Sequence, residues 1–182
     1  MAITSTTLMS GLTTTDISAL TTADVAVITT SHIVELTTTQ APFLTTRFVS
    51  ALGTDKITAL EPADLALLTD AAFATFSSAQ IVALTTEQIM ALTTSQVTLI
   101  KTNVLASLST QQVVGFNTAQ ISSLRSTAIQ ALSTAQIAAL ETRDVAVLTG
   151  TNLAAMSSVQ LQALTSAQIA GLTSSQVAGL SS

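Results

Sequence analysis

An eight-residue period runs through almost the whole chain and limits what it can fold into. From Ser5 to Leu180 the sequence divides without insertion into 22 octads, and clear copies such as Ser133–Leu140 and Thr165–Leu172 follow the pattern T-T-x-Q-[IV]-x-A-L. Position 8 of the octad is Leu, Ile, Phe or Met in every copy, and position 5 is large and apolar in all but one, where Ala41 stands. A fixed period of this kind is typical of a solenoid, in which each unit packs on its neighbours.

The spacing of the apolar positions is incompatible with one continuous helix and with a plain strand. Eight residues turn through about 800° in an α-helix, so the apolar stripe would drift by about 80° per octad. In a strand, positions 5 and 8 would point to opposite faces, because their separation is odd. A short helix that restarts in every octad satisfies the pattern, because residues three apart lie on the same helix face.

The polar residues of the octad predict where each short helix begins. Ser or Thr at position 1 can cap the helix and Gln at position 4 can reach back, which forms a capping box, while position 8 of the preceding octad meets position 5 as a hydrophobic staple. Pro62 agrees with this phase because it falls at the first helical position. Lys101 and Arg125 are poor caps, so we expect the cap to slide by one residue in some octads. Pro42, at position 6, is expected to distort its octad.

We therefore predict an all-α fold, a solenoid or superhelix of about 22 eight-residue units, each a short capped helix plus a turn; a β-solenoid is the alternative. A two-turn helix is too short to be stable alone, so each unit must bury its apolar edge against other units. Position 8 should be buried from Leu12 to Leu180, most of positions 1–3 should be exposed, and Thr, Ser and Gln should cover the outside. The small residue common at position 7 should let units approach closely. We interpret residues 1–182 as a single repeat domain, with octads over 5–180 and a bend within the variable stretch Thr37–Phe76.

Composition excludes several classes of function. Only 8% of residues are charged, the net charge is −5, and the five Lys and Arg residues are dispersed, whereas a polyanion-binding surface needs clustered cations. The chain has no cysteine, hence no disulfide framework and no thiolate metal site. Thr, Ser or Gln interrupts every short apolar run, so no membrane insertion is expected. The first residues lack the basic and apolar regions of a cleavable signal peptide.

The residues that could carry chemistry do not form a recognisable catalytic motif. Ser and Thr are abundant, but a nucleophile needs an oriented base, and the only imidazole is His32. Asp16, Asp24 and His32 occupy position 4 of successive octads, so a regular solenoid would stack them in a column that could hold a divalent metal. The alternative, which we favour, is that the acids stabilise helix starts and that His32 is a surface variant of Gln.

A second acidic group consists of Asp55, Glu61, Asp64 and Asp70 beside Lys56. Its spacing contains no calcium-binding loop, so we interpret it as a solvated face. Phe73, Phe76 and Phe116 fall at positions 5 or 8 and are expected in the core. We therefore predict no catalytic residue, no cofactor and no metal site, and we do not expect an enzyme.

The octads Ser133–Leu140 and Thr165–Leu172 resemble the octapeptide [ST]-[ST]-x-Q-[IV]-x-x-L repeat tracts of large bacterial surface or secreted proteins. The resemblance covers residues 5–180. It implies a spacer, stalk or assembly role outside the cell and carries over no catalytic residue. Pro42 and the Phe-rich stretch around it depart from the pattern.

The leading hypothesis is a non-enzymatic structural repeat domain, a spacer, scaffold or self-assembling segment of an extracellular bacterial protein. Uniform, weakly charged units favour end-to-end or lateral self-association, and the last octads show no strongly polar cap. One alternative is binding of ice or another surface through rows of Thr; another is a peptide- or glycan-binding solenoid. Nucleic acid is not an expected partner.

Overall fold

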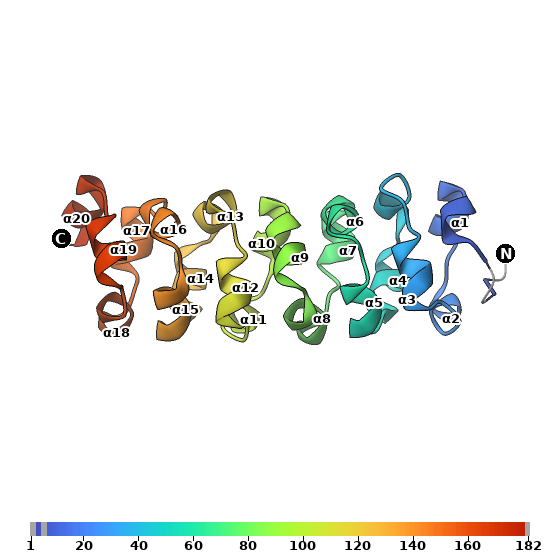
Figure 1. Ribbon diagram of the computed structural model, residues 1–182, viewed down its shortest axis with the longest axis horizontal. Helices are drawn as coiled ribbons and strands as arrows, with labels where there is room; N and C mark the ends of the chain where they lie inside the picture. Colours follow the sequence, from blue (N-terminus) through green and yellow to red (C-terminus); the bar gives the residue numbers. More distant parts are fainter. Residues whose placement is uncertain (1–2, 5–6, 181–182) are drawn as a thin grey trace. The chain divides into compact units, whose positions relative to one another are not determined.

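One short helix is present in every octad of the computed structural model, which describes residues 3–4 and 7–180. The chain forms two compact units, Met1–Leu99 and Ile100–Ser182. Figure 1 labels the elements along the chain. No strand occurs in the described residues, so the helical solenoid is confirmed and the β-solenoid alternative is wrong. Positions 1 and 2 of the first octad lie outside the described residues.

The first unit contains two 3-10 helices and ten α-helices: η1 (Met9–Gly11), α1 (Thr14–Ser18), α2 (Thr22–Val25), α3 (Thr30–Val34), η2 (Ala41–Phe43), α4 (Thr46–Ala51), α5 (Thr54–Thr58), α6 (Pro62–Leu67), α7 (Asp70–Phe73), α8 (Ser78–Ala83), α9 (Thr86–Ala91) and α10 (Thr94–Leu99). The second unit contains ten α-helices: α11 (Thr102–Leu105), α12 (Thr110–Val114), α13 (Thr118–Ser123), α14 (Ser126–Ala131), α15 (Thr134–Ala139), α16 (Thr142–Ala146), α17 (Gly150–Ala154), α18 (Ser158–Gln162), α19 (Ser166–Ala170) and α20 (Ser174–Leu180).

Each helix ends because the residues at positions 8 and 1 adopt extended backbone conformations. In α15, the preceding Ser133 has φ −69° and ψ 161°, and the following Leu140 has φ −56° and ψ 141°. The Leu140 amide still donates to the Ile137 carbonyl at 3.2 Å, which closes the last turn. No residue in the described part of the chain has a positive φ, so these turns do not depend on glycine.

The predicted capping box is confirmed. In α15 the Ser133 hydroxyl accepts from the Gln136 amide at 3.2 Å, and the Gln136 side-chain oxygen accepts from the Ser133 amide at 2.7 Å. Boxes of this type start α1, α2, α3, α8, α9, α12, α13, α15, α18 and α19.

The prediction that the cap slides by one residue is wrong: Lys101 and Arg125 remain at the cap position without a side-chain bond. Burial of positions 5 and 8 fixes where the helix starts even when the cap is poor.

Pro42 distorts its octad, as predicted, and the structure shows how. The helix starts late, as the three-residue η2, with Gln40 as its cap and Pro42 within its first two residues. Proline is tolerated there because the first amides of a helix have no partner within it. The proline therefore stands at the start of a shortened helix rather than inside a full one.

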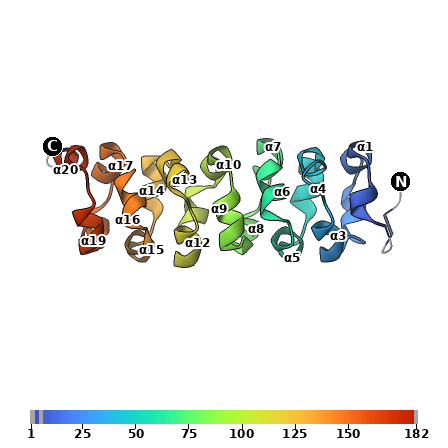
Figure 2. The same ribbon diagram turned by 45° about the horizontal axis from the view of Figure 1, so that its top comes forward.

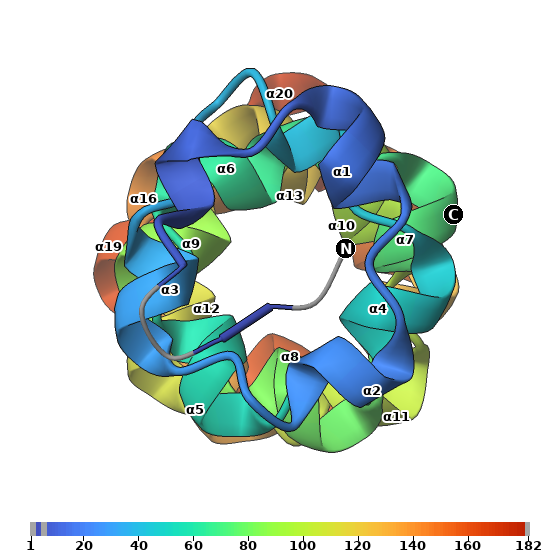
Figure 3. The same ribbon diagram turned by 90° about the vertical axis from the view of Figure 1, so that its right-hand side faces the viewer.

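Successive helices wind into a superhelix within each unit. In the first unit, helices from α1 to α7 pack against the helix three octads further along, as α4 does on α7 and α7 on α10 (Figure 2). The second unit repeats this relation, for example between α11 and α14. Viewed from its N-terminal end, the first unit winds clockwise away from the viewer, which makes the superhelix right-handed (Figure 3).

The core consists of positions 5 and 8 from successive octads. Position 8 is buried from Leu20 to Leu164, and positions 1–3 are mostly exposed, as predicted. The prediction for position 8 is wrong at the two ends, where Leu12 and Leu172 are half-buried and Leu180 is exposed. These residues belong to the first and last described octads, which have described neighbouring turns on one side only. The expected burial of aromatic residues is confirmed: Phe116 is buried, and the rings of Phe73 and Phe76 stack within the core at 4.9 Å between centroids.

Close approach at position 7 occurs at Gly171 and Gly179, whereas Gly11 at the same octad position has nothing within 4 Å of a built Cβ. A Cβ on Gly179 of α20 would lie 3.4 Å from the Gly150 Cα of α17, and one on Gly171 would lie 2.3 Å from Thr142 Cγ2. A side chain at Gly171 would therefore require the neighbouring threonine to move. Phe43 occupies the same octad position and is exposed, so not every octad uses this contact.

Candidate functional site

The polar side chain at position 4 lies inside the solenoid and joins neighbouring turns. The Gln136 side-chain nitrogen donates to the Leu105 carbonyl at 2.9 Å and to the Leu108 carbonyl at 2.7 Å, while its oxygen completes the capping box of α15. Leu105 and Leu108 occupy positions 5 and 8 of the octad that lies four octads earlier in the chain. We call this pair of bonds the amide bridge.

The amide bridge recurs with the same geometry along both units. Each bridging amide donates to carbonyls 31 and 28 residues before it, at distances of 2.6–3.2 Å, and the residues are Gln40, Gln80, Gln88, Gln96, Gln136, Gln160, Gln168 and Gln176. A helix packs against the helix three octads away, while a bridging glutamine donates to carbonyls four octads before its own. One superhelical turn therefore takes between three and four octads.

The bridge serves the carbonyls at the end of a short helix. The last carbonyls of an α-helix have no partner within the helix, and leaving them buried and unpaired costs free energy. Gln is suited to this position because one amide accepts a hydrogen bond from its own helix start and donates to another helix end. All eight bridging glutamines are buried. The expectation that Gln lies on the outside is therefore wrong, since the amide has partners on both sides.

Other residues at position 4 replace the bridge in part. The Asn152 side-chain nitrogen donates to the Leu124 carbonyl at 3.1 Å, and Lys56 Nζ donates to the Val25 carbonyl at 3.1 Å. The prediction of a solvated charge group is wrong for Lys56, which is half-buried and makes one of the two bonds that a bridging Gln would make. Apolar side chains occupy the position in other octads. Leu8 is exposed, whereas the remaining ones are buried, namely Phe48, Ala72, Val104 and Ala128.

Two aspartates, Asp64 and Asp144, are buried at position 4, where other octads have a bridging glutamine. Asp144 is 0% exposed, and neither of its carboxylate oxygens has a hydrogen-bond partner in the described part of the chain. Burial raises the pKa of the Asp144 carboxyl, and burial also raises the pKa of Asp64, with the Glu61 charge adding to the effect. The prediction of a solvated face is thus wrong for Asp64. It holds for Asp55, Glu61 and Asp70, which are exposed; Asp70 accepts a bond from the Ser95 hydroxyl.

Asp16, Asp24 and His32, the three residues that could have formed a metal-binding column, each belong to the capping box of a separate helix. Asp16 Oδ2 accepts from the Thr13 amide at 3.0 Å and Asp24 Oδ2 accepts from the Thr21 amide at 2.8 Å, while His32 Nδ1 accepts from the Thr29 amide at 2.9 Å. Hydrogen bonds from the threonine hydroxyls and amides hold the pKa of both carboxyls below their ordinary value.

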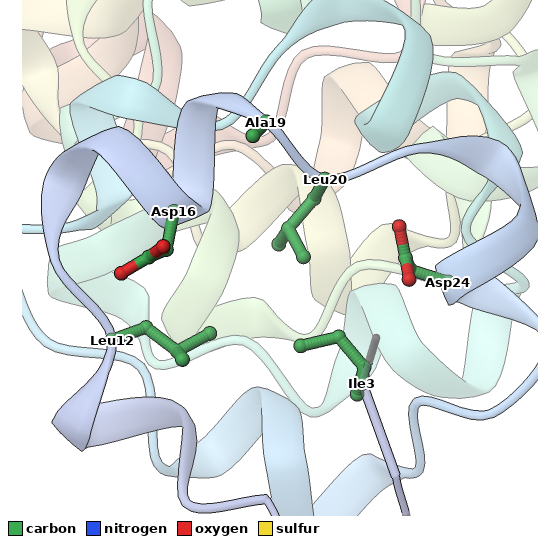
Figure 4. Close-up of a pocket in the computed structure, with 6 residues that line it drawn as sticks. All are labelled: Ile3, Leu12, Asp16, Ala19, Leu20 and Asp24. Atoms are coloured by element: carbon green, nitrogen blue, oxygen red, sulfur yellow. The ribbon is translucent and has the colours of Figure 1, made fainter. Parts of the chain in front are cut away.

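The first helices do not bring these side chains together. Asp16 and Asp24 stand on opposite sides of a hollow of about 20 Å³, with Leu20 between them and Ile3 beneath (Figure 4). Among the described residues, no group of three or more His, Cys, Asp or Glu side chains is placed to hold a metal ion. His32 is the variant of Gln that the sequence suggested, but it is buried rather than on the surface.

Sequence reasoning missed the amide bridge, because the role of position 4 in its own helix start already accounts for a polar side chain there. The signal that could have found the bridge is the recurrence of Gln at this position, as in Gln80, Gln88 and Gln96. A capping box needs only an acceptor there, which Glu also supplies, whereas Gln brings a donor as well.

The comparisons with known proteins support a repeat-containing protein. A family model described as ALTTAQ repeat matches residues 57–94 and 151–182, one segment in each unit. The six letters of that description span the end of one octad and the start of the next, as in Ala83–Gln88. No curated protein sequence matches the chain. No helix in the described part of the chain is long and apolar enough to cross a membrane. The chain is thus a protein of tandem helical repeats.

Proposed function

We propose that this chain is a non-enzymatic structural repeat domain that serves as a spacer or scaffold segment of an extracellular bacterial protein. The observation that carries the proposal is the amide bridge, which joins a turn to the turn before it by buried hydrogen bonds wherever position 4 is one of the bridging glutamines. Two such bonds contribute about 0.5–1.5 kcal/mol each when both partners are neutral. The polar position of the octad is used for cohesion between turns, which is what a spacer under load requires.

The surface also supports a structural role. The exposed threonines and serines at position 1 are engaged in capping, as Thr85 and Thr165 are, so many of these hydroxyls accept from the backbone of their own helix. A surface that is polar but carries few charges suits an environment where nonspecific ionic contacts are unwanted. The resemblance to repeat tracts of large surface proteins supports the extracellular location.

Single-molecule stretching of the chain from its two ends tests the load-bearing role. We expect the wild-type protein to resist extension and to lengthen in discrete steps. Gln168→Glu, which removes the donor to Ile137 and Leu140, should lower the force of a step. Gln162→Glu is the matched control, because Gln162 is exposed and the charge change is the same. Extension without resistance in the wild-type protein would refute a load-bearing spacer.

Protease treatment of intact cells that produce the native protein tests its location. A surface or secreted spacer should be degraded or released without lysis, while a cytosolic marker stays intact. Persistence of the full chain inside intact cells, with degradation only after lysis, would refute the extracellular assignment.

A further inference from the structure

One variant of the octad occurs once in each unit and places two carboxylates at a helix start. Glu stands at position 1 only in Glu61–Leu68 and Glu141–Leu148, and both octads carry Asp at position 4, within the shared pattern A-L-E-x-x-D-[LV]-A-[LV]-L-T. Asp16 and Asp24 also occupy position 4, but threonine hydroxyls at position 1 donate to them at 2.6 and 2.7 Å. A Glu carboxylate at position 1 has no proton to donate. We call Glu61–Leu68 and Glu141–Leu148 the acidic octads.

The aspartates of the acidic octads are buried without a hydrogen-bond donor of the kind that other octads supply. Asp64 is 2% exposed and Asp144 is 0% exposed, and both oxygens of Asp144 are unpartnered within the described chain. Arg143 makes its salt bridge with Glu141, and both of these side chains reach solvent. Buried carboxylates in proteins are normally paired or coordinate a metal ion. The acidic octads therefore lack a partner for a buried negative charge.

The register of the amide bridge shows which backbone carbonyls lie opposite these aspartates. Position 4 faces the carbonyls 28 and 31 residues earlier, and the Asn152 nitrogen reaches the first of these, on Leu124, at 3.1 Å. Asn and Asp have the same length, so one aspartate oxygen takes the place of that nitrogen. The carbonyls in register are those of Ile33 and Leu36 for Asp64, and those of Val113 and Phe116 for Asp144. Oxygen atoms from two turns thus meet with no proton between them.

A positive charge already occupies this place in one octad. Lys56 stands at position 4 of the octad before Glu61–Leu68, and its Nζ donates to the Val25 carbonyl, 31 residues earlier, at 3.1 Å. The carbonyls at the end of a helix carry partial negative charge and attract cations. In an acidic octad the chain contributes two carboxylates instead of an ammonium group, so one divalent cation would make the group neutral.

In the first unit there is space beside the carboxylates. A hollow of about 280 Å³ is lined by Val34, Glu61, Pro62 and Glu87, among others. Val34 belongs to the octad whose carbonyls are in register with Asp64, so the hollow lies between the acidic octad and the octad four octads earlier. Glu61 is exposed there. A cation can reach its carboxylate from solvent, and water molecules can complete the coordination.

We propose that each acidic octad is a calcium-binding site, in which the Asp and Glu carboxylates and the helix-end carbonyls of the octad four octads earlier are the ligands. Ca²⁺ is bound by carboxylates, backbone carbonyls and water in a flexible geometry, whereas Mg²⁺ requires a stricter octahedron and keeps more of its water. The expectation of no metal site rests on ligands from a single loop, and these ligands come from two turns. The ion takes the place of the amide bridge and joins the two turns. We expect an affinity of about 10⁻⁴–10⁻³ M, as in other sites with few carboxylates.

Calorimetric titration of the full-length, chelator-treated chain with CaCl₂ counts the sites. We expect one calcium ion per acidic octad, and Asp64→Asn and Asp144→Asn should each remove one site. These variants should fold, because Asn keeps the length of Asp and can donate to the facing carbonyl as Asn152 does. The matched control is Asp55→Asn with Asp70→Asn, which removes charge from exposed positions of the first unit and should keep both sites.

Thermal unfolding followed by circular dichroism gives a second measurement. With calcium about tenfold above its Kd, the unfolding midpoint of the wild-type chain should rise by roughly 4–8 °C. The midpoint of the double variant Asp64→Asn with Asp144→Asn should not change, and the same concentration of MgCl₂ should raise the wild-type midpoint less. In chelator, Asp144→Asn should unfold at a higher temperature than the wild-type chain, and calcium should reduce that difference.

The proposal is overturned if calcium neither binds nor raises the midpoint of the wild-type chain, or if the double Asn variant binds calcium as tightly. A midpoint that responds to acid but not to calcium would show that a proton, and not a metal ion, neutralises the aspartates, and it would also overturn the proposal. The stretching experiment is carried out in chelator, so the spacer role is judged separately.

Discussion

At the residue scale, the octad depends on an amide that accepts from one helix and donates to another. Glu is the closest substitute that separates the two roles, since its carboxylate can still accept from the cap amide but cannot donate. Gln160 illustrates both sides: its oxygen accepts from the Ser157 amide at 2.9 Å, and its nitrogen donates to the Ile129 and Leu132 carbonyls at 3.0 and 2.7 Å.

Gln160→Glu should therefore destabilise the second unit by about 1–3 kcal/mol, the cost of leaving buried acceptors without a donor. Denaturant unfolding followed by circular dichroism measures the change. Gln162→Glu, in the same helix but exposed, should change the free energy of unfolding by less than about 0.5 kcal/mol. Equal effects of the two substitutions would show that charge, rather than the lost donor, is responsible.

Asp144 provides a prediction about pH. Its pKa is raised by burial, so the folded state holds the proton more tightly than the unfolded state does. At neutral pH the carboxyl is ionised, and burying this charge lowers the free energy of unfolding. The loss disappears as the pH falls through the raised pKa of the folded state toward the unfolded value of about 3.9. Asp144→Asn should stabilise the protein at pH 7 by about 1–3 kcal/mol, because Asn can donate as Asn152 does.

The benefit of Asp144→Asn should shrink as the pH is lowered, which unfolding curves recorded across a pH series would show. Asp55→Asn removes an equal charge from an exposed site and serves as the control. If the gain in free energy of unfolding were constant with pH, or absent at neutral pH, the ionised Asp144 carboxylate would not destabilise the folded protein.

At the element scale, the octad that begins at Thr37 should be the weakest in the first unit. Its helix is the three-residue η2, and Ala41 fills position 5 with less apolar surface than Ile or Val. The position-4 residue four octads later is Ala72, which has no side-chain donor to bridge back. We expect the amides of octad Thr37–Leu44 to exchange with solvent before those of Ser77–Leu84 in native-state hydrogen exchange.

Pro42→Ala should raise protection in that octad and in the elements packed on η2, which are α1 and α6. Substitution of Ala63, an exposed residue next to Pro62, provides a control that leaves η2 intact. If octad Thr37–Leu44 were as protected as Ser77–Leu84, the shortened helix would have to be a stable bend.

The elements were largely predictable from the octad, and the contacts between turns were not. The cap at position 1, the return bond from position 4 and the buried positions 5 and 8 are local relations, which spacing within one octad reveals. The bridge from Gln136 to Leu108 joins residues 28 apart, so its partner depends on how many octads make a turn. The prediction that Gln lies outside assumes that a polar side chain is solvated, although a buried side-chain amide with partners on both sides also has its hydrogen bonds satisfied. Burial of Asp144 could not be predicted from its residue type either, because the side chain is buried by its position in the octad.

For the whole chain, the buried bridges and the engaged position-1 hydroxyls predict a cohesive interior and no activity toward ice. The Thr-rich positions are exposed, but the position-1 hydroxyls accept hydrogen bonds at helix starts. Purified protein should therefore show no thermal hysteresis and no shaping of ice crystals in a nanolitre osmometer. Clear hysteresis would favour surface binding through the Thr rows over the scaffold role.

The glutamines at position 4 donate to carbonyls of the octad four octads earlier, and solution NMR can detect this contact. With side-chain amides assigned, the Gln136 Nε2 protons should show nuclear Overhauser contacts to Leu105 and Leu108, and those of Gln168 should show them to Ile137 and Leu140. These amide protons should also exchange slowly with solvent. Glutamine amides that exchange freely and contact only their own octads would show that the bridge does not form.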